Sequence, residues 1–303
     1  MPESAPRHVV IGGASGLIGR TLAASLRADG VRVTTLVRAR DAGADEVPWL
    51  VDSDVLDPAV LDGADAVIGL NGASIGRFPW TSSYKHTLLW SRVTPARALA
   101  RAVRELGESA PHFVSASAVG YYGTHPGGPV AEDAPRGDGF LADLCGEWES
   151  AAYGAGDNAR VTTLRTAPII HRDGVLKPLI LLTKLGLSGP LGRGTQVWPW
   201  ISLDDEVRAI RHIIDTGTTG PVNLCGPTRA TANDIGFALA RELNRPYLLR
   251  APEWGLKLVL GSDPTESLLT TDAYVIPEVL AASGFSWTHE SAEDAVRAAV
   301  GQS

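Results

Sequence analysis

The sequence predicts an α/β protein with a Rossmann-type doubly wound parallel sheet and a smaller C-terminal domain. Three observations support this prediction. The first half of the chain alternates short β-rich runs with helical stretches, as βαβ units on a parallel sheet do. A glycine-rich turn, Gly13 to Gly19, lies between the first run and the first helix. After about Thr166, Pro and Gly divide the chain into short elements, which favours a loop-rich second region.

Each element of the first region is indicated by its own local pattern. Runs rich in β-branched and apolar residues, bounded by Gly, Asp or Pro, predict strands over residues 8–11, 31–37, 64–70, 111–115 and 161–165. Apolar residues at helical spacing predict helices over residues 17–28, 82–106 and 140–153. Within the long second helix, Thr94-Pro95 either starts a new helix or kinks the one in progress.

The second region is expected to be a smaller domain. We place a nucleotide-binding domain over residues 1–165 and a substrate-binding region over 166–303, which includes a C-terminal part at about 251–300. Thr231 precedes a predicted helix over 233–243, and residues 290–300 form a final amphipathic helix. The apolar stretch at 176–187 is interrupted by charged residues and is shorter than the ~20 residues that span a bilayer, so it predicts a buried or surface helix.

Composition excludes several kinds of partner. A formal net charge of -7 and a pI near 5.5 argue against nucleic acid. The two cysteines, Cys145 and Cys225, lie far apart, and the seven histidines are scattered, so neither a disulfide framework nor a metal site is expected. No apolar signal core follows Met1–Arg7, so we expect a cytoplasmic protein. We further expect a monomer or homodimer that binds a small molecule and no membrane.

The glycine-rich turn is the strongest local signal for a ligand. Gly13 permits a tight turn, Gly16 lets backbone approach a pyrophosphate, and Gly19 allows the helix to pack closely on the strand. The helix N-terminus then offers oriented N–H donors over Ser15, Leu17 and Ile18. The alternative is a glycine-rich turn in an unrelated α/β protein.

The end of the second strand distinguishes between two cofactors. About 20 residues beyond the glycines, an acid binds the ribose hydroxyls of NAD(H), whereas a cation accepts the 2′-phosphate of NADP(H). Arg38 fills that position and Arg40 follows it. Because a guanidinium suits phosphate oxygens, we predict NADP(H). The alternative is that both arginines are solvated loop cations.

Further motifs resemble the extended short-chain dehydrogenase/reductases, specifically their atypical, epimerase-like branch with a C-terminal domain of unknown function. The matching stretches run nearly end to end and include Asp54-Val55, Leu70-Asn71-Gly72, Ser91-Arg92, Ser115 to Gly123 and Trp198 to Ile201. The resemblance implies that Asp54 and Val55 contact the adenine. It further implies that Asn71, Gly72 and Ser115 line the cofactor site.

The chain departs from this superfamily at the residues that usually carry the chemistry. That chemistry relies on Tyr-x-x-x-Lys, and no tyrosine here has a lysine four residues on. Counting back from Glu149 places Leu141 and Cys145 at those two positions, while Ser117 aligns with the first serine of the usual pair and Ala118 with the second.

Several groups are candidates to replace the missing pair. They are Ser117, Tyr121, Tyr122 and Cys145. The alternative for each of them is a purely structural role in the core. Glu149 is expected on a helix surface. Trp198 and Trp200 either wall a substrate pocket or fill the hinge between the domains, and Trp80, also assigned to the pocket, is placed to face the nicotinamide half of the cofactor. Lys85 and Arg92 either hold an acidic substrate or stand exposed on the long helix.

Together these observations favour an NADP(H)-dependent oxidoreductase that transfers hydride to or from a small organic substrate without the usual Tyr-Lys pair. A second interpretation is an NADP(H)-binding sensor or assembly protein with little turnover. A third is a sugar-nucleotide epimerase, which we rank lower because its acid/base residues are missing.

Overall fold

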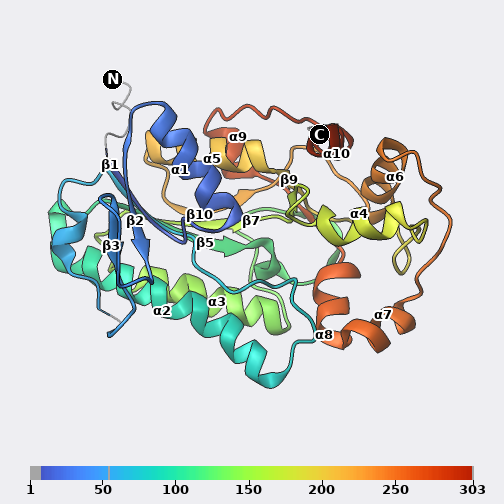
Figure 1. Cartoon of the computed structure of the whole chain (residues 1–303), viewed down its shortest axis with the longest axis horizontal. Helices are drawn as coiled ribbons and strands as arrows, with labels where there is room; N and C mark the ends of the chain where they lie inside the picture. The colour runs from blue at the N-terminus through green and yellow to red at the C-terminus, as the bar shows by residue number, and fades with distance from the viewer. Residues whose placement is uncertain (1–7, 54, 302–303) are drawn as a thin grey trace.

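The computed structural model describes residues 8–53 and 55–301 and centres on one parallel sheet (Figure 1). Its seven strands lie in the order β10-β7-β5-β4-β1-β2-β3, and all neighbouring pairs are parallel. The order reverses direction beside β1, and such a switch point leaves a crevice at the carboxyl ends of the strands. The predicted doubly wound fold is confirmed.

The strands of the main sheet are β1 (His8–Gly12), β2 (Arg32–Val37), β3 (Glu46–Pro48), β4 (Ala66–Gly69), β5 (His112–Ala118), β7 (Val161–Thr166) and β10 (Gly220–Leu224). Two small sheets pair β6 (His125–Val130) with β11 (Ala273–Val275), and β8 (Ile169–Ile170) with β9 (Ile201–Ser202). Short 3₁₀ helices lie at η1 (Pro58–Leu61), η2 (Gly107–Ser109) and η3 (Val119–Tyr122).

The helices are α1 (Leu17–Ala28), α2 (Ser82–Leu106), α3 (Phe140–Tyr153), α4 (Leu176–Lys184), α5 (Leu203–Thr216), α6 (Ala232–Glu242), α7 (Glu253–Leu260), α8 (Ser262–Pro264), the π-helical turn η4 (Thr265–Leu269), α9 (Glu278–Ala282) and α10 (Ala292–Gly301).

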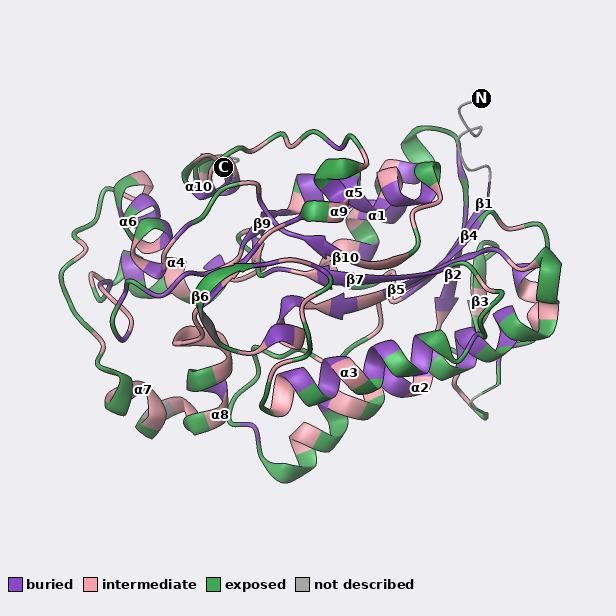
Figure 2. Ribbon diagram, turned by 180° about the vertical axis from the view of Figure 1, so that it is seen from behind, coloured by how far each residue is buried: buried purple, intermediate pink, exposed green. Residues whose placement is uncertain are grey.

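Helices cover both faces of the main sheet. Figure 1 shows α1, α5 and α9 on one face and α2 and α3 on the other. The strands are therefore buried on both sides, as their continuous apolar runs require, and Figure 2 shows them as the buried centre of the molecule. The core has separate apolar clusters on the two faces.

The five predicted strands of the first region are present, with ends that differ by up to three residues. The helix over 82–106 runs unbroken through Pro95, so no new helix starts there. Strands β3 and β6 were not predicted. The β6 sequence, His-Pro-Gly-Gly-Pro-Val, has no strand pattern, and its pairing with β11 is a tertiary contact that local sequence does not encode.

The second region contributes to the main sheet as well as to a smaller body. Strand β10 pairs with β7, and α5 packs against α1, although both follow residue 165. The remaining elements, among them α4, α6 and α10, enclose a separate apolar cluster around Trp198 and Trp200. The division at residue 165 stays a prediction. Among the described residues, no helix combines the length and the apolar character that crossing a membrane requires.

Candidate functional site

The turn between β1 and α1 is closed by two glycines that tolerate no side chain. Gly13 has a φ of +84°, and a Cβ there would lie 2.6 Å from the carbonyl carbon of Leu70. A Cβ on Gly19 would lie 2.4 Å from the carbonyl oxygen of Gly13. Both glycines are therefore required by the protein's own packing.

Gly16 differs from Gly13 and Gly19 because there is space beside it for a side chain. A Cβ there would meet only the Gly13 carbonyl oxygen, at 3.4 Å. Gly16 is also the N-cap of α1, and no side chain caps this helix end or places an acid in its first turn. The N-terminal N–H groups of α1 thus keep their partial positive charge for a ligand, and this cradle fits a pyrophosphate.

At the end of β2, two arginines have different surroundings. Arg40 donates to Asp52 over 2.6 Å, and both side chains are exposed. Arg38 is exposed and forms no ion pair with any described residue. Arg38 is thus free to bind a phosphate. Of the residues that the resemblance assigns to adenine, Val55 is exposed, and Asp54 lies outside the described residues.

The loop after β4 lies directly beside the glycine-rich turn. The Oδ1 atom of Asn71 is buried and has no hydrogen-bond partner among the described residues, and it lies 2.7 Å from where a Cβ on Gly12 would stand. Gly72 is exposed, and Ser115 on the next strand is buried, with Oγ 3.3 Å from the Ala116 carbonyl. The structure therefore brings the turn, Asn71 and Gly72 together at one edge.

At the end of β5, the predicted serine belongs to a buried ionic network. Ser117 Oγ donates to Glu149 Oε1 over 2.7 Å. Glu149 in turn accepts from Arg165 Nε at 2.9 Å and from Nη2 at 3.0 Å, and both charged side chains are buried. The expectation that Glu149 stands on a helix surface is wrong, because α3 turns this carboxylate towards β7.

The same network holds Tyr122. Its hydroxyl accepts from Arg165 Nη1 at 2.8 Å and donates to Asn223 Oδ1 at 2.7 Å, and the residue is 0% exposed. Burial raises the pKa of Tyr122 to about 12, although Arg165 and Asn223 oppose the shift. Burial likewise raises the pKa of the Cys145 thiol to about 12.

Tyr121 is placed differently from its neighbour. Its ring is only partly buried, and the Arg165 guanidinium lies 3.6 Å from its centroid. Among the described residues no hydrogen bond of its hydroxyl is found. Of the four residues predicted to carry the chemistry, Tyr121 is therefore the one whose polar atom is not committed to the protein.

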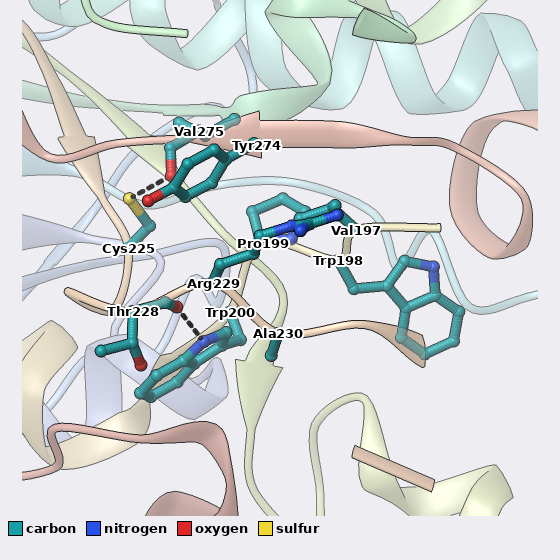
Figure 3. A pocket seen from close by; sticks show the side chains of 11 residues that line it. Val197, Trp198, Pro199, Trp200, Cys225, Thr228, Arg229, Ala230, Tyr274 and Val275 are labelled. Carbon is teal, nitrogen blue, oxygen red and sulfur yellow. Dashed lines mark hydrogen bonds between the residues drawn. The ribbon is translucent and has the colours of Figure 1, made fainter. Parts of the chain in front are cut away.

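The three predicted pocket tryptophans are all largely buried, and each indole N–H is bonded to a backbone carbonyl: Trp80 to Ile75, Trp198 to Leu269 and Trp200 to Thr228. Trp198 and Trp200 line a small pocket together with Arg229 and Tyr274 (Figure 3). Trp80 instead packs with Phe140 in a cluster between α2 and α3. The structure does not bring Trp80 together with the other two.

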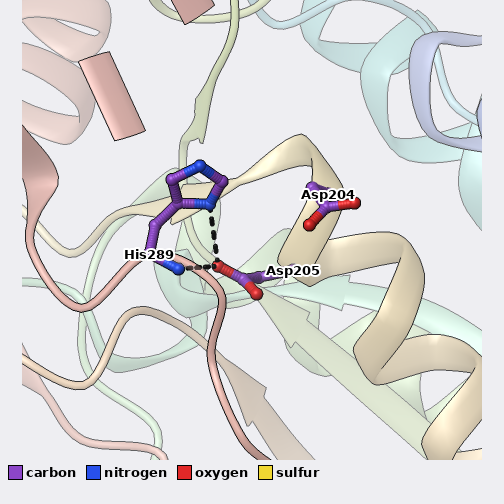
Figure 4. A group of neighbouring side chains, drawn as sticks. All are labelled: Asp204, Asp205 and His289. Carbon is purple, nitrogen blue, oxygen red and sulfur yellow. Dashed lines mark hydrogen bonds and ion pairs between the residues drawn. The ribbon is translucent and has the colours of Figure 1, made fainter. Parts of the chain in front are cut away.

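Asp204, Asp205 and His289 form a group with possible metal-ligand spacing (Figure 4). The Asp205 carboxylate, however, already accepts from the backbone N–H groups of Thr288 and His289 and from Ser202 Oγ. Burial alone would raise the pKa of Asp205, but these hydrogen bonds outweigh it and lower the pKa. Asp205 and His289 are thus satisfied as a connection between α5 and the C-terminal segment.

Comparison with known proteins assigns the family. A model of the NAD dependent epimerase/dehydratase family matches residues 9–225, which is more than half of the chain. The chain belongs to this family. A second model, of the domain of unknown function DUF1731, matches residues 251–299.

Relatives within this epimerase/dehydratase family cover almost the whole chain. An epimerase family protein of Mycobacterium leprae is 38% identical over 95% of this chain and 94% of its own length. The crystal structure of the human epimerase family protein SDR39U1 with NADPH has a TM-score of 0.87 and 27% identity, and it covers 97% of this chain and 99% of that one. A Bacillus cereus UDP-glucuronic acid 4-epimerase with NAD, at 16% identity and a TM-score of 0.74, shares the fold.

Sequence reasoning missed two features of the site, which are the network around Arg165 and the burial of Arg92. A signal for the first was available: Arg165 is the only charged residue of the strand Val-Thr-Thr-Leu-Arg-Thr, and a buried strand arginine needs a partner. Arg92 was expected to hold a substrate or stand exposed on α2, and the second alternative is wrong because the residue is 9% exposed.

Proposed function

We propose that the protein is an NADP(H)-dependent oxidoreductase of the epimerase/dehydratase family, acting on a small organic substrate at the carboxyl edge of β4 and β5. The observation that carries the proposal is the combination of an uncapped α1 N-terminus with the exposed guanidinium of Arg38, which forms no ion pair with any described residue. The first suits a pyrophosphate, and the second suits a 2′-phosphate. Bound there, the cofactor would supply or accept a hydride.

Proton transfer is assigned to Tyr121 in this proposal. Ser117, Tyr122 and Cys145 are buried, and the network or the core holds them, whereas the Tyr121 hydroxyl is uncommitted among the described residues. The Arg165 guanidinium lies 3.6 Å from the centroid of the Tyr121 ring and would hold the ring in place. In this proposal, Ser117 and Tyr122 keep the carboxyl end of β5 rigid next to Tyr121.

The second candidate is an NADP(H)-binding sensor with little turnover. The engagement of Ser117 and Tyr122 in a structural network favours it, because the positions that usually carry the chemistry are occupied otherwise. Tyr121→Phe separates the two candidates. An enzyme loses NADPH oxidation with NADPH affinity unchanged, whereas a sensor has no turnover to lose against panels of carbonyl, enone and imine compounds. We also propose that the protein is cytoplasmic and that it is a monomer or a homodimer.

The cofactor proposal is tested by calorimetry on paired arginine variants. Arg38→Ala should weaken NADPH binding by about 10- to 100-fold, since a charge-assisted hydrogen bond contributes about 1.5–3 kcal/mol, and leave NADH binding unchanged. Arg40→Ala is the matched control, because Arg40 already pairs with Asp52, and should change either affinity less than about threefold. Equal affinity of the unmodified protein for NADPH and NADH would contradict the proposal.

A further inference from the structure

Helix α4 is apolar on its outer face as well as on the face that it buries. Its inner face packs into the apolar cluster around Trp198 and Trp200. On the opposite side Leu181 and Leu182 are exposed, and Leu185 is exposed at the end of the helix. A helix that is apolar all round is normally covered all round. The outer face of α4 therefore lacks the cover that its composition calls for.

This apolar surface continues into two further segments. The Ser188 carbonyl accepts from the backbone N–H groups of Leu248 and Leu249 at 2.9 and 3.0 Å, so the end of the α4 segment lies beside residues 248–249. Helix α7 begins four residues later and exposes Trp254 and Leu258, which lie one turn apart. Figures 1 and 2 both show α4 and α7 at the end of the molecule away from β1, β2 and β3. We call this region the leucine surface, and its exposed members are Leu181, Leu182, Leu185, Leu187, Leu248, Leu249, Trp254 and Leu258.

The side chains of the leucine surface protrude into solvent. Trp254, Leu248 and Leu258 are 72%, 77% and 80% exposed, and no member of the surface lines the pocket in Figure 3. A side chain that walls a pocket for a small molecule is covered on several sides, because such a pocket encloses most of its ligand. Protruding apolar side chains that lie together are instead typical of a contact with a protein or a membrane.

Cations flank the leucines along the chain. Residues 176–195 and 244–258 together contain six cations and one acid, which gives them a net charge of +5, whereas the whole chain has a net charge of -7. The single acid, Glu253, pairs with Lys257. Four cations are exposed and form no ion pair with a described residue, and these are Lys177, Lys184, Arg245 and Arg250. The leucine surface is thus a positively charged region of an acidic protein.

This charge distinguishes between the occupants that an apolar surface could have. Two copies of the chain joined through their leucine surfaces would bring like charges together, which opposes association. An anionic phospholipid bilayer offers a partner for both features, since its acyl region takes the leucines and its headgroups take the cations. Lysine and arginine stems can lie along an apolar surface while their charged ends stay among the headgroups. Tryptophan is typical of this boundary between headgroups and acyl chains.

We propose that the leucine surface docks the protein on an anionic phospholipid bilayer. Trp254 and the leucines enter the boundary between headgroups and acyl chains, and the four cations bind the headgroups. The inference goes beyond the proposed function and does not depend on it. It differs from the expectation of no membrane partner, which rests on the lack of a segment long enough to span a bilayer, because docking on a surface requires no such segment.

The test measures flotation of the full chain with two kinds of vesicle, one of phosphatidylcholine alone and one of phosphatidylcholine mixed with phosphatidylglycerol. The unmodified protein should bind the mixed vesicles at least tenfold more tightly than the neutral ones. Added salt should weaken this binding, because salt screens the attraction between exposed charges. The Tm of each variant reports whether it is folded.

Two double variants separate the apolar contribution from the charged one. Trp254→Ser with Leu258→Ser should weaken binding to the mixed vesicles at least tenfold, since two large side chains lose their burial in the bilayer. Lys177→Gln with Lys184→Gln leaves the leucines in place and should weaken it about tenfold, because each cation near an anionic surface contributes. The matched control is Trp90→Ser, which removes an exposed tryptophan from α2 and should change binding less than twofold.

Tryptophan fluorescence shows whether the leucine surface itself enters the bilayer. Trp254→Phe keeps an apolar aromatic side chain, so its binding to the mixed vesicles should stay within threefold. The blue shift of tryptophan emission that accompanies binding of the unmodified protein should be lost in Trp254→Phe and retained in Trp90→Phe. A shift that persists in Trp254→Phe would contradict the proposed orientation.

The proposal is overturned when the unmodified protein does not float with the mixed vesicles or binds neutral vesicles equally well. It is also overturned when the folded Trp254→Ser, Leu258→Ser variant binds the mixed vesicles as the unmodified protein does. Should this variant fail to fold, the lysine double variant decides, because it changes only exposed cations. A dimer in analytical ultracentrifugation that the folded Trp254→Ser, Leu258→Ser variant abolishes, together with no vesicle binding, would assign the leucine surface to a second copy instead.

Discussion

The carboxyl edge of the main sheet has two halves that use polar residues in opposite ways. Around β1, β2 and β4, several polar groups have no side-chain partner among the described residues: the α1 N-terminus is uncapped, Asn71 Oδ1 is unpaired, Arg38 forms no ion pair, and Arg92 bonds only to backbone carbonyls. Around β5, β7 and β10, Ser117, Glu149, Arg165, Tyr122 and Asn223 bond to one another in an almost closed network.

The difference indicates where a ligand has something to bind. An uncapped helix end and an exposed cation are available to a ligand, so we propose that the α1 N-terminus and Arg38 mark the surface that a ligand completes. In the other half the same residue types stabilise the fold. A serine or tyrosine at a family's usual position is therefore a weak argument for chemistry unless its polar atom is available.

The largest effect should come from breaking the network at its centre. Arg165→Met leaves Glu149 buried and unpaired, and we expect a loss of about 3–5 kcal/mol in the free energy of unfolding. Urea denaturation measures it, with Arg101→Met as control, because the exposed Arg101–Glu105 pair should contribute less than about 1 kcal/mol. A loss below about 1 kcal/mol in Arg165→Met would remove the contrast between the two halves.

Glu206 sharpens the comparison as an exception within the satisfied half. Its Oε1 accepts from Thr166, whereas Oε2 is buried and finds no partner in the part of the chain that the structure describes, and burial raises the pKa of Glu206 to about 8. Because the folded state holds this proton more tightly than the unfolded chain, the contribution of Glu206 to stability is fully present below about pH 4.5. It falls as pH rises towards 8, by about 1.4 kcal/mol for each pH unit.

Glu206→Gln should abolish this slope and leave the neutral amide bonded to Thr166. Between pH 5 and 7.5 the unmodified protein should lose roughly 3 kcal/mol of unfolding free energy relative to the variant. Denaturation curves at several pH values measure the difference. Parallel pH profiles for the two proteins would show that Glu206 is ionised throughout and that the carboxyl has another partner.

The smallest of these effects is expected for Tyr122→Phe. Removing the hydroxyl takes one bond from Arg165 and one from Asn223, which should cost about 2 kcal/mol of stability. NADPH affinity and oxidation rate should change less than about threefold at a temperature where the variant is folded. A folded variant that loses its NADPH oxidation more than 100-fold would make Tyr122 a catalytic residue and blur the distinction between the two halves.

The sequence by itself determined the five strands β1, β2, β4, β5 and β7 of the main sheet, the glycine-rich turn and the position of Arg38, because these depend on local periodicity and on backbone freedom that only glycine has. Tertiary structure alone decided that Glu149 reaches Arg165, that Arg92 is buried without a counter-ion, and that β6 pairs with β11. Each of these joins residues distant along the chain or depends on what covers a side chain. No local pattern specifies such contacts, since the same residue would be exposed on another helix face.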